Sequence, residues 1–457
     1  MSREPGQSGG EVDPLLRFGD PKDRVRRSAR RAWSVFAHRV AGQCETWLKR
    51  GFDILLATAQ LLVLWPLLLL LRLVYGPMRR YPQLGRWCEP FDEFAFAIPV
   101  VGPHRIVRAL RLHRLPALFN ILRGDMSFVG PRPVNVGPAV RDRLYRRTCS
   151  ARPGLVCLHW IRSRSNIDFE GEAASDAEYE SGAGLRTDVG IALRAVPVLV
   201  YGSEDTEVPE TVSLLGIRID NSTMADAIDR LMADMAGTTP THVCFVNADC
   251  ANISAVNAHY RGVLARAAVV LADGIGMKIA GKLKRQPIRQ NVNGTDLFPR
   301  LCAEMEAAGR SVYLLGGKPG VADGVRDWIE AHHPGLRVAG VQHGYFPPEQ
   351  EPEVIAAIRS VQPSLLLVAM GAPRQDEWVA EHLAEAGARV GMGVGGLFDF
   401  FSGRVSRAPQ WVRDVGFEWA FRLLQEPGRL WKRYVIGNVV FLWRIAWYRP
   451  DADAGRG

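Results

Sequence analysis

The sequence predicts an α/β chain whose C-terminal half is a parallel sheet with helices on both faces. A membrane-associated, mainly helical domain with a re-entrant helix precedes it. Two observations predict this fold class. From residue 241 onward, apolar β-rich runs alternate with helical patterns, which is typical of a parallel sheet covered on both faces. Nearer the N-terminus, residues 54–71 form an apolar run without a charge, which indicates a membrane helix.

Length, composition and charge bound the function. The chain has 457 residues, so two domains with appendages are expected. Apolar residues make up 47% and charged residues 23%, as in folded proteins. The formal charge of +9 suits nucleic acid, an anionic membrane or phosphorylated substrates. Basic residues gather before the apolar run and near the C-terminus without a nucleic-acid motif, so we expect membrane lipid and phosphate as partners and no nucleic acid.

Cysteine usage indicates the compartment. The seven cysteines are scattered and form no Cys-x-x-Cys pair, which predicts reduced thiols in a cytosolic compartment and no zinc site. No other motif indicates a cofactor. The apolar run begins after residue 50, too far along the chain for a cleaved secretory signal.

The apolar run at 54–71 is barely long enough to cross a hydrocarbon core of about 30 Å. Pro66 lies inside it and is expected to kink the helix. Both flanks are basic, and the positive-inside tendency would keep both ends in the cytoplasm. A re-entrant helix satisfies these observations, and one ordinary transmembrane helix is the alternative. The flanking basic residues are Lys49, Arg50, Arg72, Arg79 and Arg80.

Three motifs in residues 49–202 carry a resemblance to a known family. They are KRGFD at 49–53, GDMSFVGPRP at 124–133 and RPG at 152–154. In these motifs the segment resembles the bacterial sugar transferases that load a phosphosugar onto undecaprenyl phosphate. Residues 163–184, rich in Ser, Gly and acidic residues, are predicted to form a surface loop.

The catalytic residues of that family are missing here. The resemblance implies an Asp-Glu pair followed by Leu-Pro-Gln, with the Asp attacking a phosphoryl group. This chain has His113 and Arg114 in place of the two carboxylates, and Ala117 in place of the Gln. We therefore predict a membrane-anchoring pseudo-enzyme. A phosphoryl-accepting His113 is the alternative, and it would make the protein bifunctional.

Polar residues and glycines follow the predicted strands of the C-terminal half, which is expected to be Rossmann-like. The strands are predicted at 243–247, 267–271, 311–315, 337–341, 364–370 and 389–394. Ligands of such sheets bind beyond the carboxyl ends of the strands, and glycine-rich turns that open into helices bind phosphate. Each turn alone is also consistent with a plain loop, but six in phase favour a site.

Residues 211–447 resemble the WecG/TagA/CpsF glycosyltransferases, glycosyltransferase family 26. Members of this family transfer a sugar such as N-acetylmannosamine or glucose from a UDP donor to a lipid-diphosphate sugar, with inversion of the anomeric centre. The matching motifs include LGIRID at 215–220, DGIG at 273–276, GTDL at 294–297, LGG at 315–317, GYF at 344–346, GAPRQDEW at 371–378, GVGGLFDF at 393–400 and RAP at 407–409.

The resemblance implies that Asp273 is the catalytic base of an inverting transfer, which must deprotonate the acceptor hydroxyl. The alternative is that Asp273 caps the helix that begins near Gly274. The remaining substrate-binding residues implied by the match are Asn247, Gly316, Gly317, Tyr345 and Gln375. The chain departs from the family at Phe245 and at Asn291, where a donor arginine is missing.

The C-terminal segment, residues 405–457, mixes aromatic and basic residues, which suits a membrane interface. The resemblance implies that it closes over the site and meets the lipid diphosphate; a solvated basic face is the alternative. The only Asp-x-Asp motif is at 451–453, so no metal is expected and basic side chains should neutralise the diphosphate. The substrate-binding residues predicted here are Arg422, Arg429, Lys432 and Arg433.

Together these observations predict an inverting glycosyltransferase at the cytoplasmic face of the bacterial inner membrane. It would use a UDP-sugar donor and a polyprenyl-diphosphate-linked acceptor in cell-surface or exopolysaccharide biosynthesis. A bifunctional enzyme and a non-catalytic scaffold are the alternatives, and a homo-oligomer is left open. The expected segments are a disordered basic tail at 1–48, the anchoring domain at 49–202, the glycosyltransferase domain at 211–404 and the appendage at 405–457.

Overall fold

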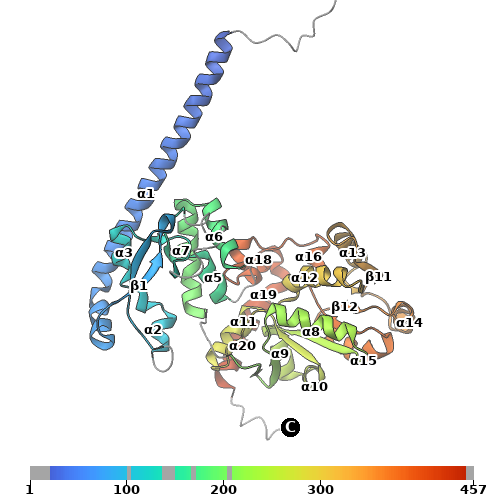
Figure 1. The fold of residues 1–457 in the computed structure, drawn as a ribbon. Coiled ribbons are helices and arrows are strands. Elements are labelled where there is room, and N and C mark those ends of the chain that lie inside the picture. The colour runs from blue at the N-terminus through green and yellow to red at the C-terminus, as the bar shows by residue number, and fades with distance from the viewer. Residues whose placement is uncertain (1–20, 100–103, 136–149, 166–170, 203–207, 449–457) are drawn as a thin grey trace, which may run out of the picture.

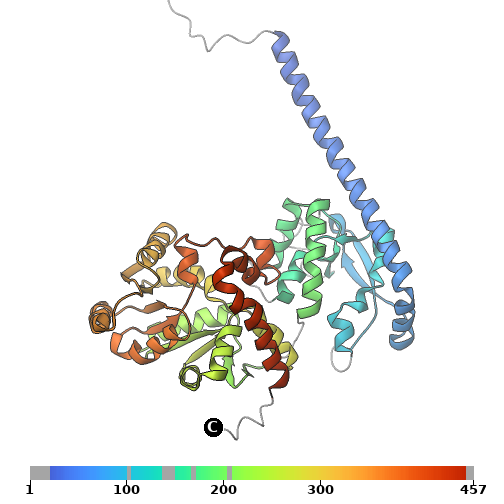
Figure 2. The ribbon, with the colours of Figure 1, turned by 180° about the vertical axis from the view of Figure 1, so that it is seen from behind.

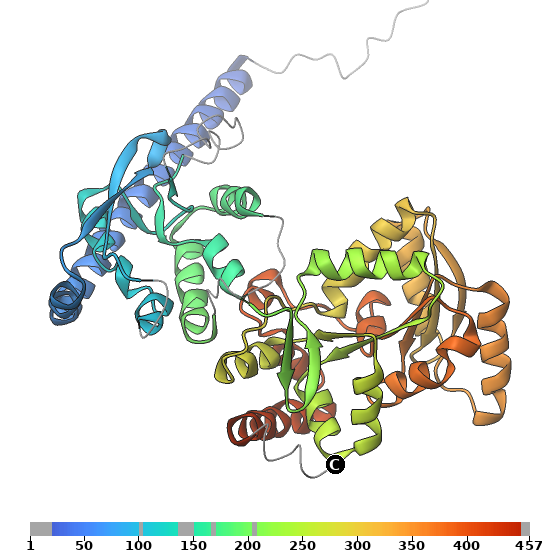
Figure 3. The same ribbon diagram turned by 60° about the horizontal axis from the view of Figure 1, so that its bottom comes forward.

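The computed structural model describes residues 21–99, 104–135, 150–165, 171–202 and 208–448 (Figure 1). A long helix projects away from two lobes, which lie side by side in Figures 1 and 3. We call the described residues up to 202 the N-terminal half and those from 208 the C-terminal half. The long helix and the smaller lobe form the first, and the six-stranded sheet lies in the second.

The projecting helix α1, Pro21–Tyr75, is continuous through Pro66. Its segment Trp47–Tyr75 is long and apolar enough to cross a membrane, and only a small share of it is buried inside the protein. Residues 21–48 are helical, where the sequence analysis predicts a disordered tail. Their Arg, Ala and Lys residues favour helix, and proline suits the first helical position. Membrane association and the re-entrant course stay predictions.

Short strands as well as helices build the rest of the N-terminal half. An antiparallel sheet has the order β2-β1-β4, and β3 pairs in parallel with β5. Ala57 of α1 packs on Ala117, Leu118 and Ile121, so this part of α1 belongs to the lobe. The elements are β1 Arg79–Leu84, β2 Pro90–Ala95, α2 Arg105–Ala109, α3 Ala117–Arg123, β3 Ser127–Val129, β4 Val134–Asn135, β5 Gly154–Val156, α5 Leu158–Ser165, α6 Glu172–Ser181 and α7 Leu185–Tyr201.

The predicted surface loop at 163–184 is wrong for its central part, because α6 lies within it. Tyr179 of α6 is buried, and its hydroxyl donates a hydrogen bond to Asp188 Oδ1 at 2.9 Å. Lys49 of α1 pairs with the other oxygen of Asp188 at 2.6 Å. The polar composition of this segment predicts a loop, but the buried Tyr179 gives the helix an apolar contact with the rest of the lobe.

The six predicted strands of the C-terminal half are confirmed. They form one parallel sheet with the order β11-β10-β12-β13-β8-β9. Every residue of five of these strands is buried, as expected for a sheet covered on both faces. The strands are β8 Thr241–Val246, β9 Val269–Ala272, β10 Ser311–Gly316, β11 Arg337–Gln342, β12 Leu365–Ala369 and β13 Val390–Gly393.

Helices cover both faces of this sheet. Residues of α8, α12, α13 and α16 share one apolar cluster with inward side chains of the sheet. The opposite face packs against α9, α10 and α11 at one end and against α14 and α15 at the other. These helices are α8 Met224–Ala236, α9 Ala248–Val256, α10 Ala258–Arg266, α11 Ile275–Leu283, α12 Gly294–Ala307, α13 Val321–His332, α14 Glu351–Val361, α15 Arg374–Ala386 and α16 Leu397–Phe401. A hairpin, β6 Thr211–Leu214 with β7 Ile217–Asp220, precedes them.

The predicted appendage is helical and only partly peripheral. It contains α17 Gln410–Arg413, α18 Glu418–Gln425, α19 Pro427–Trp431, a π-helix at Lys432–Ile436 and α20 Gly437–Trp447. Figure 2 shows these red helices crossing the back of the C-terminal half. Phe441 and Ile445 of α20 are fully buried in the cluster formed with α9, α10 and α11. Helix α20 is therefore part of the core.

Candidate active site

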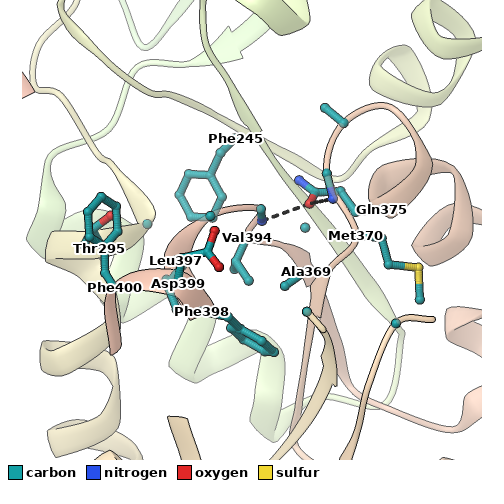
Figure 4. A pocket seen from close by; sticks show the side chains of 18 of the residues that line it. Phe245, Thr295, Ala369, Met370, Gln375, Val394, Leu397, Phe398, Asp399 and Phe400 are labelled. Carbon is teal, nitrogen blue, oxygen red and sulfur yellow. Dashed lines mark hydrogen bonds between the residues drawn. The ribbon is translucent and has the colours of Figure 1, made fainter. Parts of the chain in front are cut away.

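A cavity of about 420 Å³ opens at the carboxyl edge of the six-stranded sheet (Figure 4). The loops after all six strands contribute to its wall, as the sequence analysis predicts for a ligand site in this fold. The start of α12 and the C-terminal segment complete it. Of the predicted site residues, the wall includes Asp273, Asn247, Gly317, Tyr345, Gln375, Arg422, Arg429 and Arg433.

Asp273 follows β9 directly, and burial raises the pKa of its carboxyl group to about 6. A hydrogen bond from the Asn247 side chain and the charge of Arg433 oppose this rise. The carboxylate therefore titrates close to neutral pH, as suits a general base. The N-cap of α11 is Gly274, without a side-chain cap bond, so the alternative role of Asp273 as a helix cap does not match the structure.

The turn that carries Asp273 is fixed by its backbone. The Asp273 amide donates to the Val246 carbonyl at 2.9 Å, and the Gly274 amide donates to Asn291 Oδ1 at 2.6 Å. Gly274 has a φ of 90°, a conformation that favours glycine. Asn291, the position where the family arginine is missing, thus holds the turn beside the proposed base.

The Asn247 amide has two separate tasks. Its Oδ1 caps α9 by accepting hydrogen bonds from the Asp249 and Cys250 amides at 3.0 and 3.1 Å. Its hydrogen bond to Asp273 must therefore come from the Nδ2 group, which donates to the carboxylate. Asn247 thus fixes the orientation of Asp273 in addition to lining the cavity.

Gln375 is buried and ties two loops of the wall together. Its Oε1 accepts hydrogen bonds from the Gly371 amide at 3.0 Å and from the Gly395 amide at 2.8 Å (Figure 4). Its amide group also hydrogen-bonds Asp376. The sequence analysis assigns Gln375 to substrate; the structure adds that its oxygen is already occupied by the protein.

The two glycines after β10 differ in position. Gly317 lines the cavity, whereas Gly316 lies beneath the wall. A Cβ on Gly316 would approach the carbonyl oxygen of Ala369 to 2.5 Å, so glycine allows the ends of β10 and β12 to come together. Tyr345 is 67% exposed at the rim, where a ligand can reach it.

The cationic residues of the C-terminal segment fall into two groups. Arg422 and Arg429 approach Asp399 at 3.7 and 4.0 Å, and Arg433 pairs with Asp249 at 3.0 Å. All three arginines line the cavity. Lys432 is exposed and is not part of the wall, and its Nζ lies 5.8 Å from the centre of the Trp431 ring.

Three basic residues of the wall were not predicted. Lys318 and Arg374 follow β10 and β12, so the strand-edge argument could have found them. Arg404 has no such signal. With the three arginines above, six basic side chains face two acidic ones, Asp273 and Asp399, among the residues that line the cavity. This surplus favours a polyanion such as a diphosphate.

One group of metal-ligand types lies beneath the site. The ligand atoms of His242, Cys244 and Asp376 lie within 4.8 Å of one another. Each has a partner in the protein: His242 Nε2 contacts Cys244 Sγ at 3.3 Å, and the Tyr260 hydroxyl donates to Asp376 at 2.8 Å. Burial raises the pKa of the Cys244 thiol well above its usual value.

A second cavity, of about 490 Å³, lies in the N-terminal half at the position of the missing carboxylates. His113, Arg114, Arg108 and Glu93 line it. Glu93 pairs with Arg114 at 2.5 Å, and both side chains are largely buried. Burial and the nearby charge of Arg108 lower the pKa of His113 to about 4, so the imidazole is neutral near pH 7.

Comparison with known proteins relates each half to a family. Residues 212–454 match the Glycosyl transferase WecG/TagA/CpsF family, and residues 100–202 match the Bacterial sugar transferase family. Proteins of Staphylococcus aureus strains MW2, MRSA252 and NCTC 8325 are each 29% identical over 241 residues, covering 51% of this chain and 92% of the relative. Each is named N-acetylglucosaminyldiphosphoundecaprenol N-acetyl-beta-D-mannosaminyltransferase.

Proposed function

From the premise that this chain belongs to the WecG/TagA/CpsF glycosyltransferase family and is a hexosyltransferase, we propose its reaction. The C-terminal half transfers a sugar from a UDP-sugar to a polyprenyl-diphosphate-linked saccharide, with inversion at the anomeric carbon. The observation that carries this proposal is one carboxylate of raised pKa, Asp273, in a cavity wall with six basic side chains.

Asp273 is the proposed base. Its carboxylate accepts the proton of the acceptor hydroxyl while the hydroxyl oxygen forms a bond to the anomeric carbon of the donor sugar. The bond between that carbon and the diphosphate oxygen breaks, and UDP leaves with the electron pair. A base whose pKa lies near 6 is ionised at neutral pH and still holds a proton well enough to remove it from the hydroxyl.

The basic residues are proposed to bind the two diphosphates. Positive charge at the departing UDP stabilises the charge that develops as the bond breaks. Arg422 and Arg429 lie together near Asp399, which follows β13, whereas Arg433 pairs with Asp249, which follows the neighbouring strand β8. Two separate arginine positions support two anionic groups, the UDP and the diphosphate of the lipid acceptor.

The lipid acceptor and α1 support action at a membrane, and we propose its cytoplasmic face, where nucleotide sugars are made. The relatives are named for an undecaprenol-linked substrate. Leu62, Val63 and Leu73 of α1 are exposed in the apolar segment, as a lipid-facing helix requires. The basic flanks Arg72 and Arg79 support the re-entrant course.

The test uses the purified full-length protein in detergent with a panel of UDP-sugars and a short polyprenyl-diphosphate N-acetylglucosamine acceptor. Mass spectrometry should find an acceptor heavier by one sugar residue, with equimolar UDP. Binding of UDP-sugars without transfer to any acceptor would contradict the proposal and favour the scaffold alternative.

The match of residues 100–202 to bacterial sugar transferases favours a second candidate, a bifunctional enzyme. A phosphosugar transfer by this half would release UMP rather than UDP. The ion pair between Glu93 and Arg114 and the neutral His113 weigh against it. Incubation with undecaprenyl phosphate and UDP-sugars, followed by separation of UMP from UDP, distinguishes the two candidates.

A further inference from the structure

The carboxylate of Asp414, at the end of α17, is completely buried and bound by arginines of the other half. Arg162 Nε on α5 donates to Asp414 Oδ1 at 3.0 Å, and Arg194 Nη1 on α7 donates to Oδ2 at 3.0 Å. Gln410 adds a third donor at 3.0 Å. A buried charge of this kind is tolerated only with such partners, and removing one of them leaves the other uncompensated.

The backbone beside Asp414 is also held by the N-terminal half. The Tyr201 hydroxyl on α7 donates to the Val415 carbonyl at 2.7 Å. The Val415 side chain is buried in one apolar cluster with Trp160, Ile191 and Val198 of α5 and α7. An ion-pair network, a hydrogen bond and apolar packing therefore fix the same short segment.

This segment is connected to the proposed site in two ways, by packing against α11 and by the chain that continues into α18. Gly416 packs on Ile275, the first residue of α11, which follows Asp273 and Gly274. Lys278, also on α11, donates to the Arg164 carbonyl of the N-terminal half. Farther along the chain, α18 carries Arg422 into the cavity wall. Figure 1 shows α18 beside α5, where the two halves meet.

We propose that the N-terminal half positions part of the glycosyltransferase site in the C-terminal half. Arg162 and Arg194 are the positioning residues, and they act through Asp414. They hold the segment 410–417, and this segment sets Arg422 over the site. The proposal deepens the proposed function and rests on it, since Arg422 is one of the basic residues proposed there to bind the two diphosphates, and here it is placed at the diphosphate of the lipid acceptor. It gives the half that lacks its catalytic carboxylates a role in acceptor use beyond anchoring.

Arg194 offers the sharpest test. Its hydrogen bonds are to Asp414 and to the Gly190 carbonyl in its own helix, so its removal leaves the rest of the network in place. Arg194→Met removes the charge, and Arg194→Lys keeps it. Arg186→Met is the matched control, because Arg186 is an exposed arginine of the same helix, α7.

The full-length variants are assayed with a UDP-sugar and a polyprenyl-diphosphate acceptor, and thermal unfolding verifies that each is folded. Arg194→Met should lower kcat/KM for the acceptor about 10- to 100-fold, because catalytic groups tolerate little displacement. KM for the donor should stay within about twofold of the parent value, because the variant displaces a group that acts on the acceptor and does not remove a contact that binds the donor. Arg194→Lys should recover part of the loss, and Arg186→Met should behave as the parent protein.

Hydrogen exchange of residues 410–436 is measured in parallel and needs no activity. Faster exchange there in Arg194→Met, but not in Arg186→Met, supports the proposal. Unchanged exchange together with unchanged acceptor kcat/KM in Arg194→Met and in Asp414→Asn would overturn it. An inactive parent protein would instead contradict the proposed function, and the exchange result would still decide the positioning role.

Discussion

The cavity of the C-terminal half and that of the N-terminal half differ in the state of their carboxylates. In the C-terminal cavity, Asp273 is buried with a raised pKa and a hydrogen bond from Asn247. In the N-terminal cavity, Glu93 is closed in an ion pair with Arg114, and His113 is neutral. One cavity has a carboxylate that can accept a proton or attack a substrate, and the other has none free among the residues that line it.

The comparison shows that a long family motif can be kept where the family's Asp-Glu pair is absent. The N-terminal half keeps the GDMSFVGPRP motif, in which Ser127 donates to Asp53 Oδ2 at 2.8 Å and the Phe128 amide donates to Oδ1 at 3.0 Å. These bonds join α1 to β3 and need no catalytic residue. Family resemblance therefore reports the structure of this half, while function depends on the side chains in its cavity.

The largest expected effect comes from replacing the proposed base, Asp273. Asp273→Asn keeps the shape of the side chain but cannot accept the hydroxyl proton, so kcat should fall about 10²- to 10⁴-fold. The measurement is UDP release with the lipid-diphosphate acceptor at saturating donor. Asn291→Ala is a useful comparison, because it removes only the hydrogen bond to the Gly274 amide and should cost less. Turnover near the parent value in a folded Asp273→Asn protein would exclude Asp273 as the base.

The next largest effect should distinguish two basic residues of the C-terminal segment, Arg422 and Lys432, by their influence on acceptor kinetics. Arg422→Ala removes a cation from the cavity wall and should lower kcat/KM for the acceptor about 10- to 100-fold. Lys432→Ala is the control, since Lys432 is exposed and outside the wall, and its loss should change kcat/KM by less than about twofold. Equal losses in the two variants would mean that the segment acts through surface charge alone.

The pH profile tests the state of Asp273. Because burial raises its pKa to about 6, kcat/KM should be level above this pH and fall about tenfold per unit below it. The profile of Arg186→Met, an exposed residue outside both cavities, should coincide with that of the parent protein. A profile that stays flat down to pH 4.5 would mean that the carboxylate has an ordinary pKa or is not the base.

The free energy of unfolding should also depend on the titration of the Asp273 carboxyl group, with a smaller change than in the rate. The pKa of Asp273 is raised from 3.8 to about 6 on folding, so the folded state binds the proton more tightly than the unfolded state. Its contribution to stability therefore decreases as pH rises from about 4 to about 6. Asp273→Asn removes this loss, and its free energy of unfolding relative to the parent should increase by about 2 kcal/mol across that window. Denaturant unfolding at pH 4.5 and 7.5 measures it, and a difference that does not change with pH would contradict the buried titration.

Repeating patterns of apolar and polar residues along the chain predict its strands and helices. The six strands, the polar edge and Asp273 follow from apolar runs and from what comes after them. Contacts between distant segments leave no such pattern. Composition alone does not place Phe441 and Ile445 in the core, Arg404 in the cavity wall or Asp414 between the halves. For the same reason, Arg433 and Lys432 look equivalent in sequence although only Arg433 lines the cavity.

The smallest expected effect is none, and it comes from the other cavity. His113→Ala removes a neutral imidazole whose Nδ1 atom has no hydrogen-bond partner, so sugar transfer to the lipid-diphosphate acceptor should be unchanged. No UMP should form from UDP-sugars and undecaprenyl phosphate with either protein, because a phosphosugar transfer of this kind needs a nucleophile that the cavity lacks. Glu93→Gln, which opens the ion pair with Arg114, should likewise leave UMP undetected. Phosphate on His113 found by mass spectrometry, or UMP formation abolished in His113→Ala, would show that imidazole has replaced the missing carboxylate and that both halves are enzymes.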